Sequence, residues 1–344
     1  MKTQLAVALA CTLSAFAGAK DGKLDVIWSD VEGGAATLIV TPAGESVLID
    51  AGNPGGRDSA RIHKAATEAG LKRIDHLITT HFHIDHFGGA AELAKLIPIG
   101  TVWDNGIPEK DPDGRPDASW PLKIKSYREM QVEKREVVKP GGKLPLKQSA
   151  SAKPLSVRFI GGKQQFQHFA PGDRVSSIDC SGAKEKEKDT SDNANSVVTL
   201  VEFGAFQLFI AGDLTWNVET NLVCPLNLVG EVDVYQVTHH GLDVSNNPLV
   251  VRALKPTVTV MSNGTTKGCG AETIATLKSV PSIQAMFQIH KNLRPDSENN
   301  TSPDHIANVE KDCQALPIRL SVAEDSKSYT VNIDGKPIKT FQTR

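Results

Sequence analysis

The stretch that decides the fold is "HFHIDHFGG", residues 81–89, in which three histidines and one aspartate occupy six positions and two glycines follow. His81 and His83 alternate along an extended segment, so both rings can face the same side, whereas Asp85 and His86 come from the turn that follows. Imidazole and carboxylate groups are the usual zinc ligands outside cysteine sites, and a catalytic zinc keeps one position open for water. The stretch therefore predicts that one loop supplies ligands to two adjacent metal positions.

The chain around this stretch has the pattern of an α/β protein. Apolar and β-branched runs predict strands at residues 24–29, 36–42, 46–52, 74–80, 156–162, 196–204, 206–213, 232–241 and 257–264. Apolar residues at helical spacing predict helices at residues 57–70, 89–97, 215–223 and 248–254. A closing hairpin is expected over residues 318–335. Strands, helix, strand and a polar loop recur in this order in both halves, which predicts sheets that are covered by helices.

Polar side chains also follow predicted strands in the second half. Asp213 comes after the run "FIAG", and His239 and His240 come after "VYQVT". Ligands of open α/β sheets gather at the carboxyl ends of the strands. We therefore expect these residues to lie with residues 81–86 in one site.

The pattern HxHxDH after a hydrophobic strand resembles the metallo-β-lactamase superfamily, and the resemblance extends over nearly all of residues 20–344. It implies a four-layer αββα sandwich that is built from two similar halves. It also implies two zinc ions. The site residues that the resemblance implies are His81 and His83 for the first zinc, Asp85 and His86 for the second, Asp213 as a bridge, and Asp50 as the carboxylate that orients ligating imidazoles.

The last histidine of the family pattern falls in "VTHHG", where His240 is the preferred ligand. His239 is a further ligand, a proton donor or a residue that orients a ligand, and the sequence leaves these alternatives open.

The chain departs from the family pattern at the middle histidine. Asn193, Asn195 and Ser196 stand before the strand that leads to Asp213, and no histidine is found there. The segment "NSVVTLVEFGAFQLFIAGD" followed by "VTHHG" resembles the hydrolase domain of DNA-uptake competence proteins and the phosphorylcholine esterases, in which an Asn-Ser segment replaces that histidine. The replacement leaves the completion of the first zinc site open.

The expected function is that of an exported zinc-dependent hydrolase that cleaves phosphodiester bonds through a metal-bound hydroxide. Asp85 would orient the hydroxide, and His239 or Asp243 would return a proton to the leaving group. The expected partner is a small-molecule or anionic phosphodiester substrate, with nucleic acid only as a substrate. The alternatives are a lactone or β-lactam hydrolase and, from another class, a non-catalytic fold relative that binds metal. A non-catalytic relative would be expected to have lost some of the metal-binding residues.

Between the halves lies an expected insertion, about residues 104–190, that is rich in proline, glycine and charge. Residues 121–147 carry eight Lys/Arg against three Glu. This basic stretch is either a solvated surface or a loop that meets an anionic substrate. The formal net charge of the whole chain, −2, gives no basic excess for a nucleic-acid binder.

The first residues predict export. Residues 1–19 contain Lys2, an apolar run and small residues that suit cleavage after Ala17 or Ala19, which is the layout of a signal peptide. We expect a periplasmic or secreted protein without stable membrane association, whose hydrolase domain is residues 20–344.

Four cysteines follow the expected signal peptide, and an oxidising compartment favours disulfides. Cys180 with Cys224 and Cys269 with Cys313 is the first pairing to test; the other connectivities and buried free thiols are the alternatives.

Overall fold

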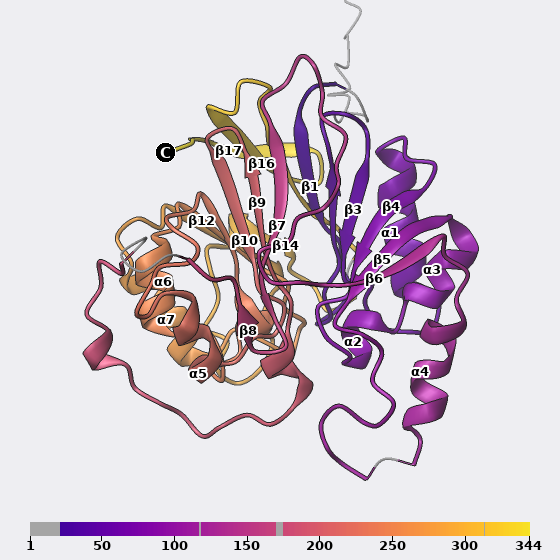
Figure 1. Ribbon diagram of the computed structural model, residues 1–344. Coiled ribbons are helices and arrows are strands. Elements are labelled where there is room, and N and C mark those ends of the chain that lie inside the picture. Colours follow the sequence, from indigo (N-terminus) through magenta and orange to yellow (C-terminus); the bar gives the residue numbers. More distant parts are fainter. Residues whose placement is uncertain (1–20, 117, 170–174, 313) are drawn as a thin grey trace, which may run out of the picture.

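Two β-sheets form the centre of the protein. The computed structural model describes residues 21–116, 118–169, 175–312 and 314–344 (Figure 1). The expected signal peptide, residues 1–19, and the expected disulfide partner Cys313 lie outside these ranges.

The first sheet combines the beginning and the end of the described chain. Its nine strands lie in the order β17-β16-β15-β1-β2-β3-β4-β5-β6. They are β1 (Leu24–Trp28), β2 (Thr37–Val40), β3 (Ser46–Ile49), β4 (Ile74–Ile78), β5 (Ile99–Asp104), β6 (Lys134–Val137), β15 (Ile318–Val322), β16 (Ser328–Ile333) and β17 (Lys336–Gln342). Strands β3 to β6 are parallel, so their carboxyl ends lie at one edge.

The second sheet has eight strands in the order β14-β13-β12-β11-β10-β9-β7-β8. They are β7 (Leu155–Gly162), β8 (Gln165–Phe166), β9 (Val198–Phe203), β10 (Phe206–Ile210), β11 (Val234–Gln236), β12 (Val258–Met261), β13 (Ala285–His290) and β14 (Ile306–Asn308). Strands β10 to β14 are parallel and, like β3 to β6, bring the loops at their carboxyl ends together.

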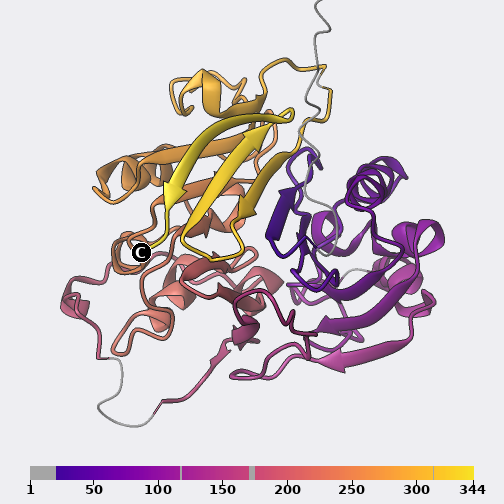
Figure 2. The same ribbon diagram turned by 90° about the horizontal axis from the view of Figure 1, so that it is seen from above.

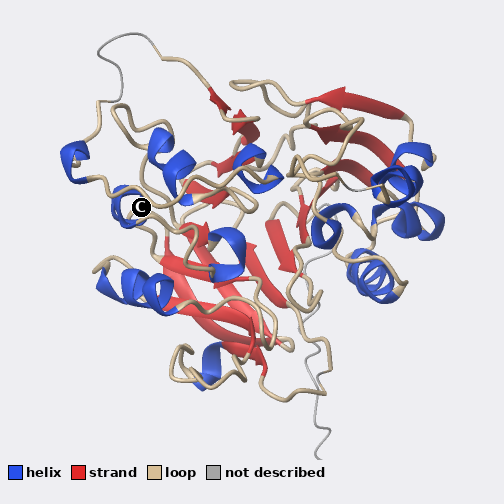
Figure 3. Cartoon of the chain, turned by 90° about the horizontal axis from the view of Figure 1, so that it is seen from below, coloured by secondary structure: helices blue, strands red, loops and turns tan. Residues whose placement is uncertain are grey.

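Helices cover the outer face of each sheet (Figures 1 and 3). On the first sheet they are α1 (Arg57–Glu68), α2 (Ile84–Phe87), α3 (Ala90–Leu96) and α4 (Trp120–Glu129). On the second they are α5 (Trp216–Glu219), α6 (Pro248–Leu254) and α7 (Ala271–Ser279). The resulting layers confirm the expected αββα sandwich.

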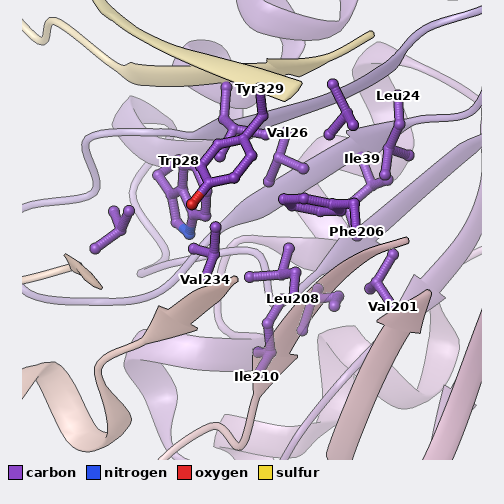
Figure 4. Packing of buried hydrophobic residues seen from close by; sticks show 14 of the residues in the cluster. Leu24, Val26, Trp28, Ile39, Val201, Phe206, Leu208, Ile210, Val234 and Tyr329 are labelled. Carbon is purple, nitrogen blue, oxygen red and sulfur yellow. The ribbon is translucent and has the colours of Figure 1, made fainter. Parts of the chain in front are cut away.

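The inner faces of the sheets bury the largest hydrophobic cluster. Leu24 and Val26 of the first sheet pack toward Phe206 and Leu208 of the second, and all four side chains are fully buried (Figure 4). Because burial of one such side chain contributes about 1.5–3 kcal/mol, this interface is a main source of stability.

A polar contact also joins the sheets. The side-chain oxygen of Gln236 accepts hydrogen bonds from Trp28 Nε1 at 2.7 Å and Thr37 Oγ1 at 2.9 Å. Gln236 ends β11, only three residues before His239. The contact therefore fixes the second sheet against the first close to the expected site.

Residues 104–190 are more integrated than an insertion on the surface. They supply β6 to the edge of the first sheet, β7 and β8 to the second, and α4, whose Tyr127 is buried. The expected strand at residues 156–162 is confirmed as β7. Most of the lysines between residues 121 and 147 point to solvent.

The C-terminal strands β15 to β17 pair next to β1, so both ends of the described chain complete one sheet (Figure 2). The expected hairpin is confirmed as β15 and β16.

Cys180 and Cys224 form a disulfide, which confirms the first expected pair. Cys269 is a buried free thiol, so the structure does not form the second expected pair, whose other member, Cys313, lies outside the described residues. No helix in the described ranges is long and apolar enough to cross a bilayer.

Candidate metal centre

The predicted loop begins where β4 ends. His81 follows shortly after the strand, and α2 carries Asp85 and His86. A Cβ atom on Gly89 would lie 2.2 Å from the carbonyl oxygen of Ala51, so only glycine permits this close approach. The glycine pair thus allows the loop to pack directly on the segment that follows β3.

Asp50 fixes the ring of His86. The Asp50 carboxylate accepts from the backbone N–H and the hydroxyl of Thr80, each at 2.8 Å, and lies 2.8 Å from His86 Nδ1. Since a carboxylate only accepts, the proton of a neutral His86 ring lies on Nδ1. Nε2 therefore carries a free lone pair, as the expected role of Asp50 requires.

The same tautomer follows for His240. Its Nδ1 lies 2.9 Å from the carbonyl oxygen of Ser262, which also only accepts. Both His239 and His240 have positive φ angles of 55°, a conformation that is costly for non-glycine residues and is typical of functional sites. The backbone is thus held in an unusual turn that presents His240 Nε2 to the first loop.

Four candidate ligands converge between the two halves. His86 Nε2 lies 3.2 Å from His240 Nε2, and both lie 3.2 Å from Asp213 Oδ2. Asp85 Oδ2 is 3.7 Å from His86 Nε2 and 3.5 Å from His240 Nε2. Imidazole nitrogens and carboxylates at these distances need a proton or a metal cation between them. The residues therefore fit a divalent metal, and the donor set of two imidazoles and two carboxylates suits zinc.

The electrostatics of this cluster also favour a positive charge. Burial alone would lower the pKa of His86, but Asp213, Asp50 and Asp85 together raise that pKa well above its usual range. Burial alone would raise the pKa of Asp213, but His240, His86 and His239 hold it well below its usual range. The carboxylates therefore stay ionised and attract cations.

His81 provides a ligand atom for a neighbouring position. Its Nδ1 lies 3.0 Å from the Thr80 hydroxyl, whereas its buried Nε2 has no hydrogen-bond partner in the described chain. This Nε2 is 4.0 Å from Asp213 Oδ2. Because a buried polar atom without a partner is costly, its position supports a second metal beside Asp213.

His83 lies beside His81 but is held by a residue that the sequence did not indicate. The two ring centroids are 4.7 Å apart, and His83 Nε2 lies 2.9 Å from Asp113 Oδ1. This bond leaves Nδ1 as the nitrogen of His83 that can bind a metal. Asp113 is thus a carboxylate that orients a candidate ligand.

His239 is the remaining histidine near Asp213. Its Nε2 lies 3.4 Å from Asp213 Oδ2, and its Nδ1 lies 3.0 Å from Ser245 Oγ. The Ser245 hydroxyl donates to Leu214 O, so it accepts from His239 Nδ1. The Nε2 of the neutral ring therefore carries no proton. Burial lowers the pKa of His239 to about 4. The neutral ring is therefore suited to bind metal or accept a proton rather than to donate one.

The Asn-Ser segment that replaces the middle histidine lies at this same position. Asn193 Nδ2 is 3.5 Å from His239 Nε2. Ser196 Oγ is 3.4 Å from His81 Nδ1 and accepts the Asp213 N–H at 3.1 Å. Asn195 instead bonds Asp192 through its amide, and so it shapes the segment without contacting a candidate ligand there.

Asp243 is not brought into the ligand cluster. Its carboxylate accepts the backbone N–H of Thr273 at 2.8 Å, in the first turn of α7. This contact gives Asp243 a part in fixing the loop after His240.

The sequence pattern did not indicate Asp113 or Lys267, whereas Asp192 lies in the segment that replaces the middle histidine. Asp192 accepts the Phe82 N–H at 2.6 Å, and the Lys267 ammonium forms an ion pair with Asp85 Oδ2. Asp113 and Lys267 come from loops outside residues 81–89. Their types were visible in the sequence, but no spacing pattern indicated their place.

A cavity of about 460 Å³ borders the segments that follow the ligands of the second half. Thr215 and Trp216, just after Asp213, line it together with Val244. Lys186 also lines it, with Nζ 3.6 Å from the centre of the Trp216 ring. Glu187, Lys188 and Asp189 line it as well, so the cavity combines an aromatic surface with charges of both signs.

Comparisons with known proteins agree with this geometry. Residues 29–159 match the family model of the metallo-beta-lactamase superfamily, which confirms the resemblance inferred from the HxHxDH pattern. A metal-dependent hydrolase of Polynucleobacter asymbioticus is 38% identical over 82 residues, 24% of this chain and 27% of that protein. One of Cupriavidus metallidurans is 33% identical over 85 residues, 25% of this chain and 27% of that protein.

The chain thus matches only about a quarter of the length of these relatives. Among solved structures, the metallo-beta-lactamase fold protein YhfI of Bacillus subtilis aligns with a TM-score of 0.45 and 11% identity, covering 77% of this chain and 95% of that one.

Proposed function

We propose that this chain, which matches the metallo-beta-lactamase superfamily over residues 29–159, is an exported zinc-dependent hydrolase of phosphodiester bonds. The observation that carries the proposal is the convergence of His86 Nε2, His240 Nε2 and Asp213 Oδ2, each pair 3.2 Å apart. The related stretches in proteins named metal-dependent hydrolases support the hydrolase class.

One metal would be held by Asp85, His86, Asp213 and His240. A second would be held by His81, His83 and Asp213, with His239 in place of the missing middle histidine. When bound, divalent ions polarise the phosphoryl oxygen and make water a stronger nucleophile at neutral pH.

The surrounding side chains would prepare the ligands and the reactants. Asp50, Thr80 and Ser262 hold imidazole rings in the tautomer that leaves Nε2 bare. Asp85, at the partly open side of the cluster, would orient the attacking water. His239 Nε2 would accept a proton if it is not itself bound to metal.

The preference for a phosphodiester rests on the sequence resemblance. The Asn-Ser and "VTHHG" segments resemble those of enzymes that act on phosphodiesters. The cavity beside Trp216, which has charges of both signs, supports a small-molecule substrate. Nucleic acid enters this proposal only as a substrate.

Export is proposed from residues 1–19 and is supported by the disulfide, since such bonds persist in oxidising compartments. N-terminal sequencing of the protein recovered from the periplasm or medium tests it. A mature end at Gly18 or Lys20 is expected, and an intact Met1 would overturn the proposal.

The activity test combines elemental analysis with three assays run side by side, on bis-p-nitrophenyl phosphate, a lactone and a cephalosporin. We expect up to two zinc ions per chain and turnover of the phosphodiester. The control is the double variant Asp85→Ala, His86→Ala, which should lose metal and activity together.

Absence of bound metal, or a control as active as the parent, would refute the hydrolase. Turnover of the lactone or the cephalosporin alone would replace the phosphodiester preference by the ring-opening alternative. Metal binding without turnover of any substrate would favour a non-catalytic relative.

A further inference from the structure

The loop after β12, residues 263–270, is packed directly on the metal-binding turn. A Cβ atom on Gly268, whose φ is +93°, would lie 2.0 Å from the carbonyl oxygen of His240. The Arg294 guanidinium donates to the carbonyl oxygens of Thr266 and Gly268 at 3.2 and 2.6 Å. These contacts hold the intervening residue, Lys267, in a defined place.

The side chain of Lys267 is directed across this surface to the site. Its Cβ and Cδ atoms lie 3.4 Å from where a Cβ of Gly33 would be, so the aliphatic stem runs along a segment without a side chain. Its ammonium reaches Asp85 Oδ2. This is the same carboxylate oxygen that faces His86 Nε2 at 3.7 Å and His240 Nε2 at 3.5 Å.

Lys267 has the most exposed side chain of this group. The side chains of His86 and His240 are 0% and 1% exposed, that of Asp85 is 17% exposed, and that of Lys267 is 36% exposed. A ligand that approaches the buried nitrogens from the side of Asp85 therefore meets Lys267 first.

The ammonium has more hydrogen-bond donors than this contact uses. A lysine ammonium carries three N–H groups, and Asp85 takes one of them. A phosphodiester brings non-bridging oxygens that bear negative charge and only accept hydrogen bonds. The remaining donors match that chemistry, whereas a neutral ester or lactone offers no charged oxygen.

We propose that Lys267 binds an anionic oxygen of the substrate beside Asp85 and so makes the site selective for anions. This inference rests on the proposed metal site and deepens the proposed function by naming a residue that selects the substrate class. The competing role is that Lys267 only neutralises Asp85 and is displaced when metal binds.

The test measures binding without requiring turnover. Diethyl phosphate, an unreactive phosphodiester anion, is titrated calorimetrically into the zinc-loaded protein, its Lys267→Met and Lys267→Arg variants, and the control Lys291→Met. Lys291 is exposed on the segment after β13, and its substitution makes the same change of charge. Zinc content is measured for every sample.

Because hydrogen bonds between charged groups are stronger than neutral ones, we expect Lys267→Met to weaken binding by about tenfold or more at unchanged zinc content. Lys267→Arg should retain most of the affinity, and Lys291→Met should match the parent. Unchanged affinity in Lys267→Met, or no binding by the parent, would overturn the proposal. A changed zinc content in Lys267→Met would assign Lys267 to the metal site instead.

A second readout separates this inference from the proposed function. Wild-type protein that binds diethyl phosphate through Lys267 but does not hydrolyse bis-p-nitrophenyl phosphate would refute the hydrolase alone. Where turnover occurs, Lys267→Met should raise KM for that anion more than it lowers kcat, and Lys267→Arg should restore most of the KM. A loss of kcat with an unchanged KM would show that Lys267 acts through Asp85 and not on the anion.

Discussion

His86 Nε2 and His240 Nε2 face each other at 3.2 Å, although the two residues are 154 positions apart. Each ring is held through Nδ1, by Asp50 and by Ser262 O, so the two free nitrogens point to one place. Such a contact between two ring nitrogens needs a proton or a metal cation between them. Because His240 faces His86 and the adjacent His239 does not, we expect the two histidines to have different roles.

His240→Ala should remove the tighter metal, and His239→Ala should affect only the other. His240 Nε2 lies close to His86, Asp85 and Asp213, whereas among these candidate ligands His239 approaches only Asp213, at 3.4 Å. Since even residues behind the ligands contribute about 10- to 100-fold to metal affinity, loss of a ligand should cost at least as much. Zinc titration with a chelating dye measures both variants. If both variants lost the same zinc equivalent, the two histidines would not serve different metal positions.

Asp113→Asn should weaken metal binding at the position of His81 and His83. The change removes the charge that orients His83, whose Nε2 lies 2.9 Å from Asp113 Oδ1. We expect affinity for one of two zinc equivalents to fall by about 10- to 100-fold. The control is Asp325→Asn, which makes the same change of charge at an exposed position. Two unchanged binding equivalents in Asp113→Asn would show that His83 is not a ligand.

Glu219→Gln should make stability less dependent on pH. Burial raises the pKa of Glu219 from 4.5 to about 7. Between these values the folded protein holds the proton more strongly than the unfolded chain, so stability falls as pH rises, by up to about 3 kcal/mol. The variant has no such proton to lose.

Urea unfolding at pH 4.5, 6 and 8 measures the effect of Glu219. The free energy of unfolding of the parent, relative to that of Glu219→Gln, should decrease along this series. Glu310→Gln, at an exposed position, serves as the control. A constant difference between parent and variant would mean that Glu219 titrates normally.

Removal of the disulfide should lower thermal stability. Cys180 and Cys224 close a loop with a sequence separation of 44, and a bond of this kind contributes about 2–4 kcal/mol. Cys180→Ser, Cys224→Ser should melt several degrees lower and should no longer respond to a reductant. Cys269→Ala, at the buried free thiol, should keep the parent's response. A parent that melts identically with and without reductant would contradict the expectation.

The fold was largely predictable because its strands are apolar and its helices show a periodic pattern. Two strands that the sequence did not predict, β13 and β17, have weaker local signals. β13 contains the polar Gln288 and is a strand because parallel neighbours pair on both sides, and β17 is largely exposed at the sheet edge. Their structure depends on tertiary pairing more than on local sequence.

The site was predictable where its residues share a short motif or follow a strand. Residues 81–86, Asp213 and His240 were found in this way, and the structure brings Asp85, His86, Asp213 and His240 together. Asp113 and Lys267 were not found, because their contacts depend on how distant loops pack. Asp243 contacts the backbone of Thr273, on a helix that the sequence did not indicate.

The division of the ligands between the two halves has a consequence for the order of events during folding. His86 comes from the first sheet's side and His240 from the second, and neither half alone has the full set. A nascent chain that has completed only β1 to β6 can bind metal weakly at most. High-affinity loading must wait until both sheets have closed on their shared core, so acquisition of metal marks the end of folding rather than its beginning.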